Sequence, residues 1–359
     1  MLGVACGDYG SDAYTFAPMT DSLFDDAPSP DPIVMRVRPA AVGEALQRLG
    51  RRLPQDVFLG TSSWSFPGWQ GLVYADACSE SLLAREGLSA YAQHPLLRMV
   101  GIDRGYYQPM PRDEFARYAS QVPESFRFLV KAPALVTDAI QRGERGAPLQ
   151  SNPHFLDAAI AGEQFVRPAL EGLGQHAGPL LFQLPPLPAE MTSADAAPAT
   201  IERIGAFLTA LPSRVGELQP LYAVELRNAE LLTPRFVRML RESGARLTVG
   251  VHARMPAAAR QSAALRGLDA TDDEGDDWRL KGPLVVRWNL HSGFRYDDAK
   301  NRYAPFDRLI DVDIATRGTL VHLVHVAQKS GQPSFIIANN KAEGSAPLSL
   351  IELAKSIVG

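Results

Sequence analysis

Short apolar runs alternate with longer amphipathic segments along most of this chain of 359 residues. From residue 56 onward, eight runs rich in β-branched and aromatic residues have the length typical of buried strands. We predict strands at residues 57–63, 96–103, 126–132, 179–185, 221–227, 246–252, 283–291 and 334–340. Most of them are followed by helical periodicity, at residues 81–93, 111–122, 157–174, 199–211, 233–244, 313–331 and 346–359.

Other segments depart from this alternation. The helical pattern after the sixth strand is weak, and the acidic segment DATDDEGDDW, residues 269–278, takes the place of a helix there as a solvated loop. Residues 36–55 are basic and predict a short helix. Residues 1–35 are acidic and proline-rich with little periodicity, which predicts a flexible tail before a single domain at 36–359. Packing of this tail on the domain, or binding to a partner, stays open.

Eight β units, each followed by a connecting segment that is mostly helical, predict a parallel sheet covered by helices. The count of eight favours a closed (β/α)₈ TIM barrel over an open doubly wound sheet. Neither GxGxxG nor GxxxxGK[ST] occurs in the sequence, so no dinucleotide or P-loop site is indicated.

Composition and charge narrow the classes of partner. The formal net charge is −4, so no overall positive field attracts nucleic acid or acidic membranes. The two cysteines, Cys6 and Cys78, form neither a disulfide framework nor a metal cluster, which indicates a reducing compartment. No run of about 18 apolar residues predicts a membrane span. The first residues lack the pattern of a secretory signal, so we expect a cytoplasmic protein.

Polar residues stand where the predicted strands end. In a TIM barrel, the C-terminal strand ends form the functional face, and alternate side chains of each strand point inward. Ala223, Glu225 and Arg227 share one face of the fifth strand, for example, and the opposite face stays apolar. This alternation predicts one polar mouth formed by Asp103, Lys131, Gln183, Glu225, Arg227, Arg287, Asn289, His291 and one or both of Asn339 and Asn340. Each residue also has a structural interpretation, such as an ion-pair layer inside the barrel.

The segment GTSSWSFPGWQGLVY, residues 60–74, covers the first strand and the loop after it. Pro67 and Gly68 predict a turn in this loop. We expect Ser63 and Trp64 to reach the mouth and Trp69 to form a wall or lid of a binding site. In the alternative interpretation, both tryptophans only fill the top of the barrel.

Five stretches together resemble the YecE-like family, also called domain of unknown function 72. They are GTSSWSFPGWQGLVY, FRFLVKAPALVT, GPLLFQLPP, YAVELRN and FIIANNKAEGSAP, and they span about residues 57–352. The resemblance implies a TIM-barrel fold, in agreement with the strand count. Two segments differ from the family pattern: GIDRGYYQP has Asp103 where the family has glutamate, and VVRWNLHSG matches at Arg287 but displaces His291 by two residues.

The residues at the predicted mouth are suited to acid–base chemistry. We single out Asp103, Lys131 and Glu225 as candidate catalytic residues, because two carboxylates can act as acid and base or as nucleophile and acid. A lysine of lowered pKa at a strand end can also form a Schiff base. A divalent metal on Asp103, Glu225, His252 and His291 stays open, but no HxH or HExxH spacing supports it, so no metal ligand is assigned and no cofactor is indicated.

Three functions remain open at this point. The first is an enzyme, such as a hydrolase or lyase, that acts on a small polar or anionic ligand, for example a sugar or sugar phosphate. The second is a metal-dependent nucleic-acid-processing barrel, which needs a basic surface that the sequence does not clearly show. The third is a non-catalytic ligand sensor or interaction protein. The sequence leaves the oligomeric state undetermined.

Overall fold

The computed structural model describes residues 36–143, 147–269 and 277–359. Within them, Val37–Gly359 form one compact unit. The predicted tail at 1–35 and most of the predicted acidic loop, residues 270–276, lie outside the described residues. In the described part of the chain, no helix is both long enough and apolar enough to cross a membrane.

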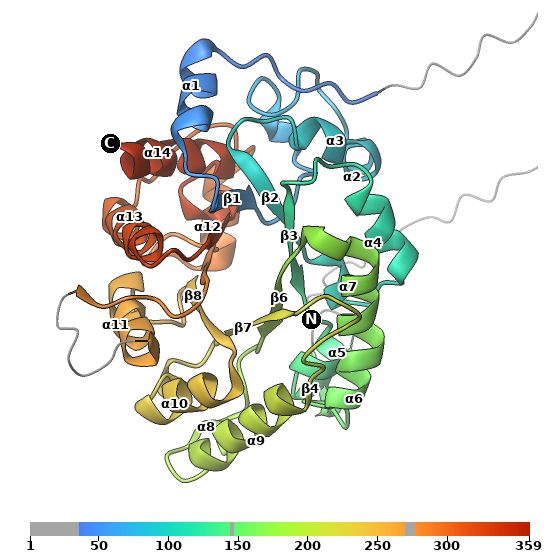
Figure 1. Ribbon diagram of the computed structural model, residues 1–359, viewed down its shortest axis with the longest axis vertical. Coiled ribbons are helices and arrows are strands. Elements are labelled where there is room, and N and C mark those ends of the chain that lie inside the picture. Colours follow the sequence, from blue (N-terminus) through green and yellow to red (C-terminus); the bar gives the residue numbers. More distant parts are fainter. Residues whose placement is uncertain (1–35, 144–146, 270–276) are drawn as a thin grey trace, which may run out of the picture. The chain divides into compact units, whose positions relative to one another are not determined.

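Eight parallel strands close into a barrel at the centre of the molecule, which confirms the predicted fold (Figure 1). Neighbouring strands follow each other in the chain, and β1 pairs with both β2 and β10 to close the ring. Each predicted strand overlaps one observed strand. The barrel strands are β1 (Val57–Thr61), β2 (Leu97–Ile102), β3 (Arg127–Lys131), β6 (Ala177–Gln183), β7 (Leu221–Glu225), β8 (Arg246–Val251), β9 (Leu284–Trp288) and β10 (Ser334–Ala338).

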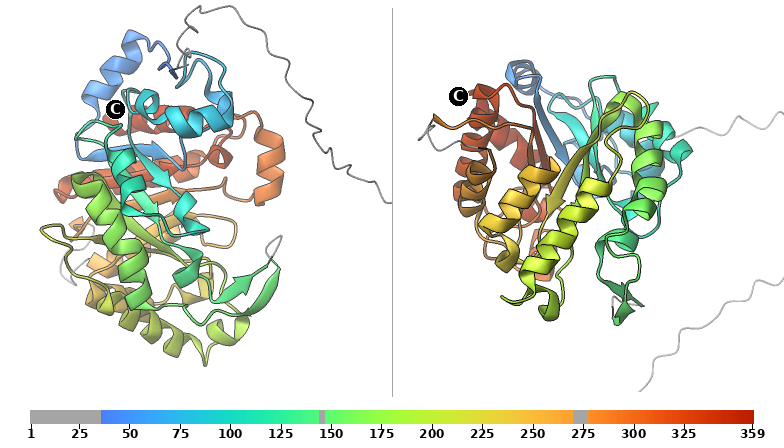
Figure 2. Two further views of the ribbon diagram at one scale, coloured as in Figure 1. Left: turned by 90° about the vertical axis from the view of Figure 1, so that its right-hand side faces the viewer. Right: turned by 60° about the horizontal axis from the view of Figure 1, so that its bottom comes forward.

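Helices surround the barrel on the outside, as all three views show (Figures 1 and 2). They are α1 (Glu44–Arg52), α2 (Glu80–Glu86), α3 (Leu88–Tyr91), α4 (Arg112–Ala119), α5 (Ala134–Thr137), α6 (Ala158–Ala161), α7 (Arg167–Leu173), α8 (Ala189–Thr192), α9 (Ala197–Ala210), α10 (Pro234–Ser243), α11 (Ala258–Asp269), α12 (Tyr296–Tyr303), α13 (Ile314–Lys329) and α14 (Ala346–Val358). Local signals set several ends. In α10, the Thr233 side chain accepts a hydrogen bond from the amide of Phe236, and Gly244 ends the helix in the left-handed region.

Two apolar clusters of the described residues form the core around the barrel strands, and a third, smaller one lies at Leu290, Ala299 and Tyr303. A small apolar cluster fills the barrel interior, and a much larger one lies between the strands and the helices. The inner cluster takes one residue parity from each contributing strand: Met99, Leu129, Leu181, Ala223, Val285, Phe335 and Ile337. In five of these strands, the residue two places further on has the same parity and reaches the C-terminal end of the barrel. The alternation therefore positions the functional face.

The helix after the sixth barrel strand corrects one prediction. We expected the acidic loop to replace it, but α11 follows β8. The buried residues of α11 have helical spacing, but two of these buried positions hold the polar residues Gln261 and Asp269. These polar residues are hydrogen-bonded inside the protein, so the apolar period along the sequence is weak although the helix packs.

A β-hairpin and helix α12 were not predicted, because their sequences have no apolar periodicity. The antiparallel hairpin of β4 (Ile140–Arg142) and β5 (Pro148–Ser151) projects away from the barrel (Figure 2). Every residue of β5 is exposed. Helix α12 is rich in charged residues and lies in the connection between β9 and α13.

Candidate functional site

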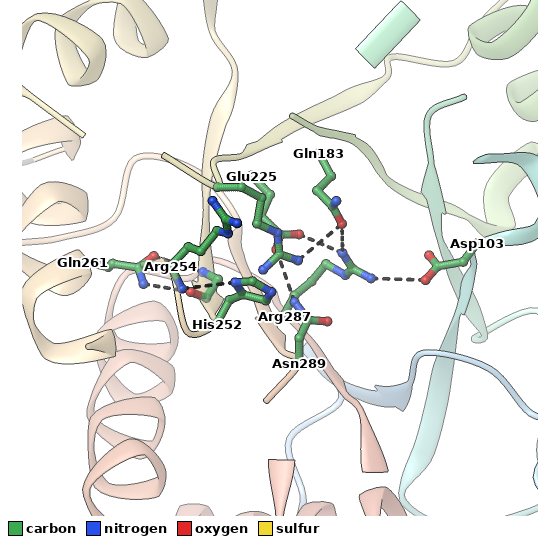
Figure 3. A network of polar contacts seen from close by, with 10 residues as sticks. Asp103, Gln183, Glu225, His252, Arg254, Gln261, Arg287 and Asn289 are labelled. Atoms are coloured by element: carbon green, nitrogen blue, oxygen red, sulfur yellow. Dashed lines mark hydrogen bonds and ion pairs between the residues drawn. The ribbon is translucent and has the colours of Figure 1, made fainter. Parts of the chain in front are cut away.

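Arg287 lies at the centre of a polar network at the C-terminal end of the barrel (Figure 3). Its guanidinium Nη1 donates to Glu225 Oε2 and to Gln183 Oε1, both at 2.8 Å. Its Nη2 lies 3.3 Å from Asp103 Oδ2 on the other side. The side chain of Arg287 is 4% exposed, so this one buried cation joins the buried carboxylate of Glu225 on β7 to the partly exposed carboxylate of Asp103 at the end of β2.

Glu225 is the anion at the base of the network, and its side chain is fully buried. Its Oε1 lies 2.7 Å from Arg227 Nη2 and also accepts a hydrogen bond from Asn289 Nδ2 at 3.2 Å. Burial raises the pKa of Glu225, but attraction by Arg227, Arg287 and Lys131 outweighs this effect and leaves the pKa below its ordinary value. Glu225 is therefore an ionised anchor for two arginines.

Lys131 ends β3 and stands apart from these pairs. Its ammonium Nζ lies 3.6 Å from the centroid of the Tyr106 ring, a cation–π contact. In the described part of the chain, that ammonium has neither a hydrogen bond nor an ion pair. Burial lowers the pKa of Lys131 to about 8, because attraction by Asp103 and Glu225 offsets desolvation only in part and both arginines repel the charge.

We call these residues the polar ring: Asp103, Lys131, Gln183, Glu225, Arg227, Arg287 and Asn289. The ring holds three cations and two carboxylates, a difference of one positive charge. His252, on the loop that follows β8, adds no charge at neutral pH, because burial and Arg227 lower its pKa to about 4. Two donor atoms, Arg227 Nη1 and Arg287 Nε, are buried without a hydrogen-bond partner among the described residues, as is the acceptor Asp103 Oδ1. The ring is thus cationic and has unused hydrogen-bonding capacity.

Gly250 on β8 makes room for the ring. A Cβ at this position would lie 3.1 Å from Glu225 Oε1 and 3.2 Å from its Cγ. The buried Gln261 of α11 holds the backbone of Gly250: its Oε1 accepts from the Gly250 amide at 3.0 Å, and its Nε2 donates to the Gly250 carbonyl at 2.9 Å. Gln261 thus fixes the backbone of Gly250 beside the side chain of Glu225, at a position where any larger residue would crowd that carboxylate.

The polar ring thus brings together seven of the predicted site residues. Asn339 lies nearby in the fold at the end of β10, where its Nδ2 donates to Ser62 Oγ at 2.8 Å. Ser63 is half-buried and its hydroxyl contacts Ser65. Neither residue has a hydrogen bond to the ring within the described ranges.

Both tryptophans lie in the packed layer outside the barrel, which corrects their predicted place at the mouth. Trp64 is buried, donates to the carbonyl of Leu83 and packs edge-on against Tyr118. Trp69 is fully buried and donates to Asn340 Oδ1, which also accepts from the amide of Ala346. The alternation explains this arrangement, since Asn340 has the parity opposite to Asn339 and points away from the interior.

His291 also lies apart from the ring. Its Nδ1 is 2.7 Å from the carbonyl oxygen of Ser292, and its ring packs edge-on against Phe294. His291 and His252 were the histidines of the metal site that the sequence left open. Over the described residues, no group of three or more His, Cys, Asp or Glu side chains is placed to hold a metal ion.

Three contributors to the site escaped the sequence analysis: Tyr106, Gly250 and Gln261. Tyr106 follows Asp103 by three residues, in the short turn after β2 that brings its ring under Lys131. Gly250 has the inward parity of β8, so the alternation offered a signal for it. Gln261 gave none, because its helix was not predicted.

Comparison with known proteins agrees with this architecture. The family described as "Protein of unknown function DUF72" matches residues 58–358. The structure of a DUF72 family protein from Enterococcus faecalis V583 is 18% identical, with a TM-score of 0.52 over 84% of this chain and 95% of that one. One from Thermotoga maritima MSB8 is also 18% identical, with a TM-score of 0.51 over 83% of this chain and 98% of that one. No curated protein shows a significant match.

Proposed function

This chain belongs to the DUF72 family, and we propose that it binds a small anionic substrate at the C-terminal end of its barrel and acts on it by acid–base chemistry. A sugar phosphate or another small phosphate or carboxylate fits this description. The excess positive charge of the polar ring is the observation that carries the proposal. A cation that is largely shielded from water is costly unless it forms an ion pair, and Lys131 forms none with the described residues.

The unused donors support an anion rather than a neutral ligand. Arg227 Nη1 and Arg287 Nε are buried without acceptors. Leaving such donors unpaired costs about 1–3 kcal/mol for each group, more where it is charged. An anionic oxygen placed among Arg227, Arg287 and Lys131 would satisfy donors and charge together. Charge-assisted hydrogen bonds of this kind are the stronger class in proteins.

In this proposal Lys131 is the proton-transferring group. A general acid or base works best when its pKa lies near the working pH, and the pKa of Lys131 is about 8. Asp103 is the second candidate, because one of its oxygens has no hydrogen-bond partner. We assign Glu225 a positioning role, since each of its oxygens already binds an arginine.

Ligand binding coupled to proton uptake provides the test. The wild type and the Lys131→Met variant would be titrated by calorimetry with inorganic phosphate, glucose 6-phosphate and glucose, in buffers of different ionisation enthalpy at pH 8. A bound anion raises the pKa of Lys131, so we expect proton uptake with the anions and none with glucose. At about 100 times its dissociation constant, a ligand should also add about 2.7 kcal/mol to the free energy of unfolding.

Lys281 provides the matched control. It is exposed and precedes β9, at the opposite end of the barrel, so Lys281→Met removes the same charge away from the ring. We expect Lys281→Met to keep binding and proton uptake and Lys131→Met to lose uptake. Binding of these anions that is equal in all three proteins, or the absence of any binding, contradicts the proposal. A metal-dependent stabilisation by a short oligonucleotide alone supports the nucleic-acid function instead.

A further inference from the structure

We infer that Lys131 is a nucleophile that condenses with an aldehyde or ketone group of the anionic substrate to form a Schiff base. This inference rests on the anion site of the proposed function and names its substrate class, a small anion that carries a reactive carbonyl. It gives Lys131 the role of nucleophile and leaves proton transfer to Asp103, the second candidate named above. The geometry points to it through three features of Lys131: its residue type, the lack of an ion pair with any carboxylate of the described residues, and its contact with Tyr106.

The residue type is informative because this chain uses lysine sparingly. Only six of its 36 basic side chains are lysine, and the other two cations of the polar ring are arginine. Arginine holds its proton at every physiological pH, whereas lysine can release it. An ion-pair layer has no need of a group that can deprotonate. A lysine at the end of β3 keeps a primary amine in the site.

The carboxylates of the ring are held by arginines and not by Lys131. Glu225 is paired with Arg227 and Arg287, and Asp103 Oδ2 is paired with Arg287. A direct carboxylate partner would keep the amine protonated, as in an ordinary salt bridge. Burial lowers the pKa of Lys131 to about 8, since the attraction of Asp103 and Glu225 offsets desolvation only in part and Arg287 and Arg227 oppose it.

Tyr106 keeps the amine in place without binding its lone pair. The ring face lies 3.6 Å from Lys131 Nζ, so it stabilises the charged form by a cation–π contact and leaves the nitrogen free once it is neutral. Tyr106 and Lys131 come from the ends of adjacent strands β2 and β3. A nucleophile on a rigid barrel strand, packed against one aromatic face, is positioned more precisely than one on an open loop.

The proposed step is a condensation that requires no oxidant. The lone pair of the neutral Lys131 amine attacks the carbonyl carbon; the nitrogen loses one proton and the carbonyl oxygen takes one up, which gives a neutral carbinolamine. The carbinolamine hydroxyl is then protonated and leaves as water while the nitrogen lone pair forms the C=N bond and the nitrogen loses its remaining hydrogen as a proton, so amine and carbonyl become imine and water. We assign these proton transfers to Asp103, because its charge acts on Lys131 and its Oδ1 has no hydrogen-bond partner among the described residues.

Reductive trapping tests this step. The full-length protein would be incubated at pH 7 with glyoxylate, a small anionic aldehyde, and sodium cyanoborohydride, and each of the six lysines would be followed by peptide mapping. Because an amine of pKa about 8 holds far more neutral form at pH 7 than an ordinary lysine, we expect Lys131 to be modified at least about tenfold faster than the exposed lysines. The Lys131→Arg variant, checked for folding by thermal unfolding, should lose this fast modification.

Lys341 is an internal comparison. Burial also lowers its pKa to about 8, but it lies in the β10–α14 connection, outside the polar ring. We expect Lys131 to react faster than Lys341. Equal rates at the two lysines, or a rate at Lys131 no higher than at the exposed lysines, overturn the inference.

A neutral aldehyde separates this inference from the proposed function. If acetaldehyde modifies Lys131 as fast as glyoxylate does, the Schiff base is supported and the preference for an anion is contradicted. If glyoxylate binds with proton uptake but is not trapped at Lys131, the anion site is supported and the Schiff base is overturned.

Discussion

Glu225 on β7 and Arg287 on β9 meet across the intervening strand β8, with Oε2 and Nη1 2.8 Å apart and both side chains buried. Gly250 is the residue of β8 in register with Arg287. Because it has no side chain, the carboxylate of Glu225 can lie over its strand. The central ion pair of the site thus depends on a third residue that contributes only space.

The Glu225–Arg287 pair predicts strong coupling in stability. Removing one partner leaves an uncompensated buried charge, so we expect Glu225→Gln and Arg287→Met each to lower the free energy of unfolding by about 3–5 kcal/mol. The double variant should lose less than the sum of the two. Urea denaturation of the four proteins measures the coupling.

The exposed pair Glu44–Arg48 on α1 is the control for that cycle. Its side chains are 81% and 57% exposed, so Glu44→Gln should cost less than about 1 kcal/mol. Strict additivity in the buried cycle would show that Glu225 and Arg287 do not act as a unit.

Gly250→Ala should destabilise the protein although alanine is ordinarily the better residue in regular structure. The added methyl group would lie within 3.2 Å of Glu225, and crowding of a packed interior costs about 1–3 kcal/mol. Gly318→Ala on α13 is the matched substitution, since a Cβ there has no neighbour within 4 Å. We expect that variant to be neutral or more stable by up to about 1 kcal/mol. Equal effects in thermal unfolding would contradict the close contact.

The lowered pKa of Lys131 predicts that the free energy of unfolding rises as the pH increases above about 8. Its pKa is about 8 in the folded protein and about 10.5 when unfolded, so between these values the unfolded chain binds more protons. The free energy of unfolding of the wild type should therefore rise by about 2 kcal/mol relative to Lys131→Met from pH 7 to pH 10. Denaturation curves at the two pH values measure this difference. Parallel pH profiles would show that Lys131 titrates normally.

The buried His94 and the partly buried His252 predict a loss of stability in acid. Burial lowers the pKa of His94 and of His252 to about 4, and Arg227 adds to the effect at His252. Between about pH 6.5 and 4 the unfolded chain therefore binds more protons, and the folded state loses stability as pH falls. Because the imidazole ring of His252 is partly exposed and solvent screens part of the effect, His252→Asn should remove about 1 kcal/mol of the decrease between pH 7 and pH 5. His176→Asn serves as control, and an identical acid profile for all three proteins would exclude this origin.

The inward face of each strand could be predicted from the sequence because the alternation of side chains is a local property of the backbone. In a strand, successive side chains point to opposite faces whatever the strand packs against, so Ala223 with Glu225, and Val285 with Arg287, had to share a face. Eight such segments separated by connecting segments were enough to predict the closed barrel. The sequence also indicated which of these faces becomes polar at the C-terminal end.

The partners within the site were decided by the tertiary structure. Which side chains meet depends on the stagger of strands around the barrel, and no single segment contains that information. Barrel closure therefore decided that Glu225 crosses Gly250 to Arg287. It also left Lys131 beside Tyr106 without a carboxylate of its own.

The first loop and α11 show the same division. Aromatic residues beside polar ones are typical of a binding site, so the sequence suggested that Trp64 and Trp69 lie at the mouth. Instead, the loop packs against α2 and the β10–α14 connection, which places both side chains outside the barrel. Helix α11 buries Gln261 because its amide group bonds to the backbone of Gly250, which the sequence pattern could not reveal. The sequence by itself determined the strands, their inward faces and the barrel, because these follow from backbone geometry and local hydrophobicity. Only the tertiary structure decided the pairings and the isolated lysine, because these depend on contacts between residues far apart in the chain.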